Sequence, residues 1–295
     1  MGVIIRQSLL NSLSSYSGLA LGAVNTLILY PLAFMPENTA VFGLIQMILN
    51  YTLIISTFTA FGMPQVMVRF HQRVKEALYG ELGFFGIIVP IAFLLPFGIL
   101  LLVYREPLAF WLTENAEDGE LLYTYLPLLV FTAAFNVYFE IFSSISQVHL
   151  RSVLPQFLKE VGRRLVATLL LLAFLLDWIN TEQFIWLFCL MFPAQFVIML
   201  FVLWRKGQLK LQRSLKGLPL RSMVDFGFFG FLTFGGELLL SRIDQLMIAK
   251  YINLENVVFY TIAFFIGNVI NTPLRASLGI SRPNVSAKIE REEYS

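Results

Sequence analysis

The sequence contains very little cysteine or histidine. Its single cysteine, Cys189, excludes a disulfide within the chain and a zinc site built from cysteines. Because Cys189 lies in the apolar run 188–191, we expect a buried and inert thiol. The only two histidines, His71 and His149, fall in separate charged segments. The sequence therefore predicts no metal site.

The motifs of common enzymes are also missing. The chain has no glycine-rich phosphate loop, no His-Glu-x-x-His zinc motif and no Gly-x-Ser-x-Gly nucleophile turn. A membrane-bound transferase would need a pair of metal-binding carboxylates or a His/Asp centre near the membrane surface, and neither pattern is present. We therefore predict that the chain is not an enzyme and that it needs no cofactor.

Charged residues are scarce, whereas apolar residues are abundant. Asp, Glu, Lys and Arg make up 14% of the 295 residues, against about 25% in an ordinary soluble domain. Hydrophobic residues make up 57%, and the mean hydropathy is +0.73. These few polar residues cannot cover the surface of a soluble protein of this size. The composition therefore predicts an integral membrane protein. The 21 basic and 19 acidic residues nearly cancel, so nothing in the charge points to a nucleic-acid partner.

Long apolar runs set the expected fold class, an all-α membrane protein with about eight transmembrane helices. A helix needs about 20 mostly apolar residues to cross the hydrocarbon core. A β-barrel is excluded because its strands alternate between polar and apolar residues over about 10 positions, whereas these runs are continuously apolar. The predicted spans cover residues 8–34, 41–61, 82–104, 121–144, 153–176, 184–204, 225–249 and 257–278.

Basic residues gather on one side of the predicted membrane. The other side carries Arg105, Lys250 and the acidic loop 114–120. Because cytosolic loops are enriched in Lys and Arg, this pattern predicts that the N- and C-termini are both cytosolic. The residues assigned to the cytosolic side are Arg6, Arg69, Arg73, Lys75, Arg151, Lys159, Arg163, Arg164, Arg205, Lys206, Lys210, Arg213, Lys216, Arg221, Arg282, Lys288 and Arg291.

A short repeat suggests how the spans are organised. Residues 37–50 and 255–268 share Glu, Asn, Ile and Asn at matching positions, and both follow a span that starts in the cytosol. Parallel repeats of this kind build two-lobed transporters. We therefore expect a six-helix lobe over residues 1–218 and the first two helices of a second lobe over residues 219–295. The chain would then be the N-terminal part of a longer carrier; the alternative is a complete eight-helix protein.

Polar side chains within the predicted spans mark a candidate substrate cavity. Ionisable groups are costly in a membrane and usually face a protein interior or water. Arginines in such a cavity suit phosphate or carboxylate groups, whereas interior acids suit coupling to protons or sodium ions. Small and polar residues on one face of the first span fit either a wet lining or tight helix packing. The candidate residues are Arg242, Asp244, Glu237, Arg69, Arg275, Glu140, Asn25 and Asn268.

Three short stretches resemble a known family of exporters. They are residues 241–251 (SRIDQLMIAKY) with 258–263 (VFYTIA), residues 6–8 (RQS) and residues 61–64 (FGMP). They are similar to stretches of the Wzx-type polysaccharide flippases, in the multidrug/oligosaccharidyl-lipid/polysaccharide exporter superfamily. The resemblance covers the whole chain but only the N-terminal portion of such a protein. It implies two MATE-like lobes that form a V in the bacterial inner membrane.

The same resemblance implies a function and partners. A flippase of this kind moves a lipid-linked oligosaccharide pyrophosphate through a cationic central cavity by alternating access. The expected partners are that substrate, membrane lipid and a coupling ion, either a proton or sodium. Two alternatives remain: a drug or cation antiporter of the same superfamily, which would rely on acidic cavity residues and tolerate the loss of Arg242, and a fragment without activity of its own.

Overall fold

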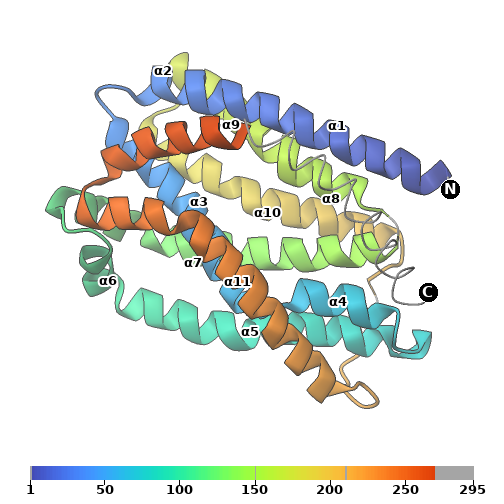
Figure 1. The fold of residues 1–295 in the computed structure, drawn as a ribbon. Helices are drawn as coiled ribbons and strands as arrows, with labels where there is room; N and C mark the ends of the chain where they lie inside the picture. Colours follow the sequence, from blue (N-terminus) through green and yellow to red (C-terminus); the bar gives the residue numbers. More distant parts are fainter. Residues whose placement is uncertain (1, 150, 210, 270–295) are drawn as a thin grey trace, which may run out of the picture.

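The computed structural model describes residues 2–149, 151–209 and 211–269, and every regular element in these residues is a helix (Figure 1). The prediction of an all-α protein is confirmed. The elements are α1 (Gly2–Val24), η1 (Asn25–Leu29), α2 (Tyr30–Phe34), α3 (Thr39–Ala60), α4 (Met63–His71), η2 (Glu76–Leu78), α5 (Tyr79–Val103), α6 (Arg105–Leu112), α7 (Ala116–Val148), α8 (Val153–Phe157), η3 (Leu158–Gly162), α9 (Arg163–Leu175), α10 (Thr181–Arg205), α11 (Leu220–Tyr251) and a final helix, Leu254–Val269.

Six of these helical stretches are long and apolar enough to cross a membrane, so the chain is a multi-pass membrane protein. Eight were predicted. The predicted span 153–176 corresponds to an unbroken helical stretch, α8–η3–α9, that ends at Leu175, but its first half carries Lys159, Glu160, Arg163 and Arg164. The eighth predicted span is described only as Leu254–Val269, and its remainder lies outside the described residues. The six spans are Arg6–Phe34, Thr39–Ala60, Glu76–Val103, Ala116–Val148, Thr181–Arg205 and Leu220–Tyr251.

Local signals explain where several helices begin and end. The Asn115 side chain accepts a hydrogen bond from the Glu117 backbone N–H and starts α7, while Asn180 and Gln183 form a capping box at the start of α10. Helix α3 ends because Phe61 and Gly62 both have positive φ angles, of 48° and 68°. Pro64 is the second residue of α4 and lies in the first helical turn, where its missing N–H costs nothing.

The helix connections gather at two opposite ends of the bundle (Figure 1). The basic end holds the start of α1 and connecting residues 72–75, 151–152, 206–209 and 211–219. There the Gln212 N–H donates to the Gly80 carbonyl, 3.0 Å away. The acidic end holds residues 35–38, 113–115 and 252–253. There the Glu114 N–H donates to the Lys250 carbonyl over 2.9 Å. This separation agrees with the charge asymmetry of the loops, with one correction: Lys159, Arg163 and Arg164 lie within helical stretches, not in a connection.

We expect the basic end to face the cytosol, and the single buried cysteine makes this easy to test. Lys216 is exposed at the basic end and Glu117 is exposed at the acidic end. In intact cells, an impermeant maleimide should label a Glu117→Cys variant but leave Lys216→Cys unlabelled until the membrane is opened. Labelling of Lys216→Cys in intact cells would show that the orientation is reversed.

Helices α3 and α7 form the centre of the bundle. Phe42, Leu44 and Ile45 of α3 are fully buried, and so are Ala133 and Val137 of α7. Helix α5 instead leaves a row of large apolar side chains exposed, including Leu95 and Ile99, as expected for a helix that faces lipid.

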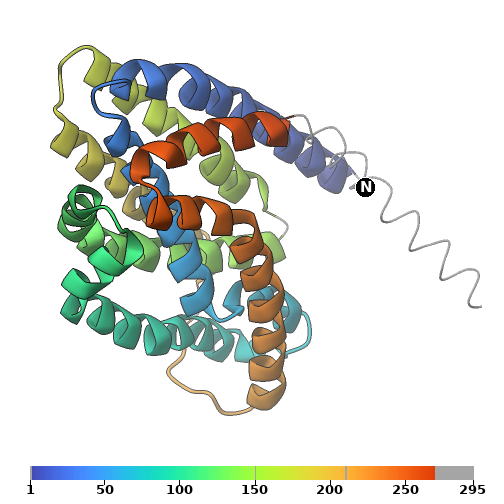
Figure 2. The same cartoon turned by 60° about the vertical axis from the view of Figure 1, so that its left-hand side comes forward.

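Helix α11 lies across α3 and α4, and the final helix turns back beside α1 (Figure 2). Met223 of α11 belongs to the same buried cluster as Met63 and Val66, and Leu254 packs with Leu44. The described part of residues 219–295 thus packs directly on residues 1–218. The division of the chain into two lobes stays a prediction.

Candidate functional site

A cavity of about 400 Å³ lies between α3, α4, α7, η3 and α11. We call it the central cavity. Its apolar wall includes Leu53, Val137, Phe231 and Phe234. Its polar wall draws side chains from all five elements: Ser56, Thr57, Gln65, Asn136, Glu140, Lys159, Glu237 and Ser241. Polar groups that converge in a mostly apolar hollow are typical of a ligand site.

The break between α3 and α4 shapes one side of the central cavity. Gly62 and Pro64 line it directly. A Cβ atom on Gly62 would collide with the backbone carbonyl oxygen of Gly227, so the absence of a side chain lets α11 approach closely. The left-handed φ of Gly62 also turns the chain at this point. The cavity wall therefore depends on a glycine at a helix crossing.

An ion pair stands on the opposite wall. The Lys159 Nζ lies 2.7 Å from the Glu140 Oε1, and the two side chains are 42% and 28% exposed. Glu237, on α11, is an exposed carboxylate that lines the same cavity. Among the described lining residues these three carry the charge, so the wall has two acids and one base. The resemblance to polysaccharide flippases implies a cationic cavity instead, and the described part of the wall is not cationic.

Behind this wall, Arg163 holds a buried polar network together. Its Nε donates to the Gln195 Oε1 and its Nη2 donates to the Asn136 Oδ1, both over 2.8 Å. Asn136 in turn donates to the Ser56 Oγ, also over 2.8 Å. The guanidinium also lies within 5.5 Å of the Phe139 ring centre. The network connects α3, α7, α9 and α10, and it fixes two of the polar residues that line the cavity.

The five-residue π-helical turn η3 orients these charges. Gln195 Nε2 donates to the Leu158 carbonyl over 2.7 Å and satisfies a backbone oxygen of the turn. On this turn Lys159 meets α7, whereas Glu160 forms a 2.8 Å ion pair with Arg164 beside α1. Such turns are rare and occur frequently at functional sites. One short segment thus directs two ion pairs to different neighbours.

Two of the predicted site residues, Glu140 and Glu237, line the central cavity. Asn25 does not: it is buried between η1 and α9, donates to the Arg164 carbonyl and accepts from the Thr168 hydroxyl, both over 2.8 Å. Gly18 on the same face of α1 packs closely against Glu160. Of the two explanations for the polar face of the first span, the described structure therefore favours helix packing.

The two predicted cations that the structure describes, Arg69 and Arg242, do not line the cavity. Arg69 is exposed near the basic end, with its guanidinium carbon 4.1 Å from the centre of the Phe226 ring. Arg242 is partly buried beside Ser241, and its Nε has no hydrogen-bond partner among the described residues. Arg275 lies outside the described residues.

The remaining predicted residues bond within the C-terminal part of the chain. Asp244 is exposed on α11 and accepts a 2.6 Å hydrogen bond from the Tyr260 hydroxyl. The Asn268 Nδ2 donates to the Phe264 carbonyl one turn earlier in its helix, over 3.0 Å. Neither residue lines the central cavity, so their roles in substrate binding stay predictions.

Sequence reasoning missed Lys159, which it assigned to the cytosolic side, and Arg163, which it did not place in the interior. A usable signal was present. Lys159 and Arg163 are four residues apart inside the apolar run 153–176, and Asn136 and Glu140 have the same spacing on α7. Because residues four apart share a helix face, each pair marks a polar face on its helix. The matching spacing could have predicted that these two faces contact each other.

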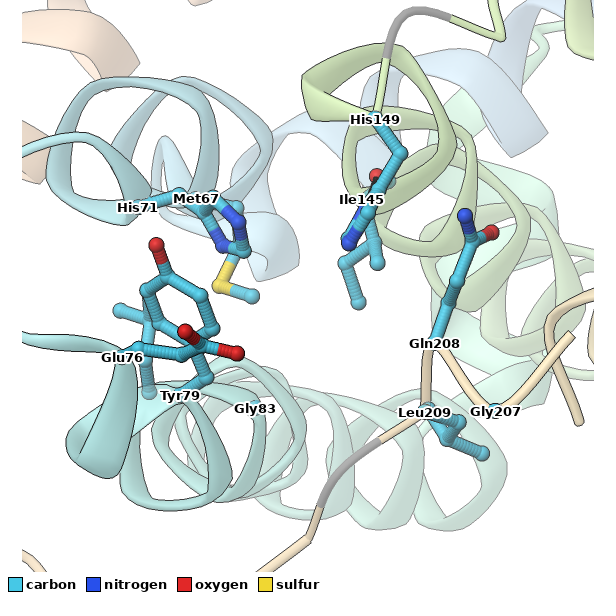
Figure 3. A pocket seen from close by; sticks show the side chains of 11 residues that line it. Met67, His71, Glu76, Tyr79, Gly83, Ile145, His149, Gly207, Gln208 and Leu209 are labelled. Carbon is cyan, nitrogen blue, oxygen red and sulfur yellow. Dashed lines mark hydrogen bonds between the residues drawn. The ribbon is translucent and has the colours of Figure 1, made fainter.

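A smaller cavity of about 80 Å³ lies at the basic end (Figure 3). It brings together the histidines that the sequence places in separate segments: the His71 and His149 ring centres are 5.1 Å apart, and His71 stacks on Tyr79 at 3.9 Å. His149 Nδ1 lies 2.9 Å from the Ile145 carbonyl oxygen. Within residues 2–149, 151–209 and 211–269, no group of three or more His, Cys, Asp or Glu side chains could hold a metal ion.

Comparison of the chain with protein-family models, with curated proteins and with solved structures finds no match.

Proposed function

We propose that the chain is a transporter that carries the head group of a lipid-linked oligosaccharide diphosphate across the membrane, for polysaccharide export. The observation that carries this proposal is Lys159, a cation on the wall of a cavity that is also lined by α3, α7 and α11, three helices long and apolar enough to cross a membrane. A lysine ammonium group is a common partner of phosphate oxygens in proteins. The head group would enter the cavity while the lipid tail stays among the exposed apolar side chains of the helices.

The stretches that resemble the polysaccharide flippases support the same proposal. Two of them contribute to the central cavity: Gly62 and Pro64 from residues 61–64, and Ser241 from residues 241–251. The volume of about 400 Å³ falls in the usual range of small-molecule sites, about 300–1,000 Å³. This volume suits a diphosphate with its nearest sugar, rather than a whole oligosaccharide.

A second candidate function is antiport of a drug or a cation, favoured by the acidic lining. Glu140 and Glu237 both line the cavity, whereas Arg242 does not. An antiporter of cations would use these carboxylates as its binding groups. The two functions predict opposite effects of removing a carboxylate: binding of an anion should strengthen, and binding of a cation should weaken.

Deletion of the gene from the cell that encodes it tests the proposed function. Because the diphosphate head group cannot cross the hydrocarbon core unaided, we expect lipid-linked oligosaccharide to accumulate on the cytosolic leaflet and surface polysaccharide to disappear. Mass spectrometry of extracted lipids and staining of the cell surface would measure both. Normal polysaccharide together with a new sensitivity to cationic drugs would support the antiporter instead.

A further inference from the structure

We propose that Glu140 is the resident counter-ion of Lys159 and that a diphosphate must displace it to bind. Glu140 would then be a selectivity residue, which admits anions of several charges and excludes those of one charge. This inference rests on the proposed function and names the residues that recognise its substrate. It also explains how a cavity with two acids and one base could accept an anion.

The Lys159–Glu140 contact is the one a ligand can reach. Both side chains are partly exposed, and both line the central cavity. A second ion pair, Arg164 with Glu160, is held more firmly, because the Arg164 Nη1 also donates to the Glu160 backbone carbonyl over 2.7 Å. Arg163 is already bonded to two neutral amides. Lys159 is therefore the cation that an anion in the cavity can take over.

Lys159 needs a partner of opposite charge. An ammonium group without a counter-ion is costly at membrane depth, and breaking a pair by removing one partner leaves an uncompensated charge. Glu140 supplies that partner over 2.7 Å. The pair therefore stabilises Lys159 within the cavity wall.

The same pair sets a threshold for ligands. Glu140 belongs to the same chain as Lys159, so it competes at a high effective concentration. A free anion of one charge presents Lys159 with no more negative charge than the Glu140 carboxylate does, so such an anion cannot displace Glu140. A diphosphate brings more than one negative charge and several acceptor oxygens, and Asn136, beside Glu140 on the wall, could donate to it. The released Glu140 carboxylate remains within a cavity that also contains Thr57 and Gln65 as neutral donors.

Binding to the purified protein in detergent, measured by calorimetry, tests the inference. The probes are farnesyl diphosphate, farnesyl methyl phosphate (a phosphodiester with one negative charge) and inorganic pyrophosphate. The wild type should bind farnesyl diphosphate at least about tenfold more tightly than farnesyl methyl phosphate, equivalent to about 1.4 kcal/mol. Glu140→Gln should bind both lipids more tightly and lose most of this preference. Lys159→Gln should weaken binding of the diphosphate by about tenfold or more. Inorganic pyrophosphate lacks the lipid tail. If the variants act on the diphosphate group alone, their affinities for pyrophosphate should rank in the same order as their affinities for farnesyl diphosphate.

Glu160→Gln is the matched control, since it removes a carboxylate from the neighbouring ion pair, which does not line the cavity. It should keep the preference of the wild type. Lys159→Arg should restore binding of the diphosphate, which separates loss of the cation from misfolding, and the double variant Glu140→Gln/Lys159→Gln should bind the diphosphate as poorly as Lys159→Gln.

The outcomes separate this inference from the proposed function. If the wild type and Glu140→Gln both fail to bind farnesyl diphosphate, the proposed function is wrong and the inference falls with it. If the wild type binds but the Glu140 and Lys159 variants bind equally well, the inference alone is overturned. Weaker binding of the diphosphate by Glu140→Gln would also overturn it.

Discussion

Replacing Gly62 with alanine is expected to destabilise the contact of α11 with α3 and α4 by about 2–5 kcal/mol. Two effects add. Gly62 has a φ of 68°, a left-handed conformation that costs alanine about 1–2 kcal/mol. The new methyl group would also meet the backbone carbonyl of Gly227, and a backbone atom cannot turn aside as a flexible side chain can. Thermal unfolding of the purified protein, followed by tryptophan fluorescence, measures the loss.

Two other glycines separate these effects. Gly207 also has a positive φ, of 62°, but a Cβ added there meets nothing within 4 Å, so Gly207→Ala should show only the cost of the backbone conformation. Gly236 has open space around it and no positive φ, and it lies inside α11, where alanine is the better helix former. Gly236→Ala should therefore not lower the melting temperature. If Gly62→Ala melts at the same temperature as Gly207→Ala, the close approach of α11 does not contribute to stability.

Arg163→Met is expected to destabilise the protein by about 3 kcal/mol or more. The substitution fills a similar volume but removes two charge-assisted hydrogen bonds, each worth about 1.5–3 kcal/mol. It leaves the side-chain oxygens of Asn136 and Gln195, which are 2% and 5% exposed, without these donors. Because Asn136 also lines the central cavity, the cavity wall should loosen together with the fold.

Arg205→Met provides the matched control, because Arg205 lies exposed at the end of α10. Its melting temperature should equal that of the wild type. Arg163→Lys should fall between the wild type and Arg163→Met, since lysine keeps the charge but cannot reproduce the planar, two-sided donation of arginine. An unchanged melting temperature in Arg163→Met would mean that the network is not needed for stability.

Much of the architecture could be predicted because a long apolar run has few alternatives to a helix in a membrane. The predicted span 184–204 lies wholly within α10, for example, and 41–61 differs from α3 by only a few residues. Residues 153–176 were harder. A polar turn inside an apolar helix is stabilised by partners on other helices, such as Gln195 for the Leu158 carbonyl, and a hydropathy pattern contains no information on those partners.

The candidate site shows the same limit. Helical periodicity correctly identifies which side chains share a face of one helix, as for Asn136 and Glu140. It does not identify the helix that this face meets, so Asn25 and Glu237 looked alike in the sequence although one is packed between helices and the other lines the cavity. The contact between His71 and His149 was likewise not predictable, because it depends on how the ends of α4 and α7 meet.

The π-helical turns Asn25–Leu29 and Leu158–Gly162 have a consequence for any future alignment of homologues. Each holds about one residue more than the α-helical turn it replaces. A homologue that has lost such a turn would therefore be one residue shorter at that place, and the correct alignment would need a gap inside a helix. If the gap were placed in the next loop instead, every intervening position would be compared with a neighbour rotated by about 100° around the helix. Conservation of Lys159 and Arg163 would then be scored against the wrong columns.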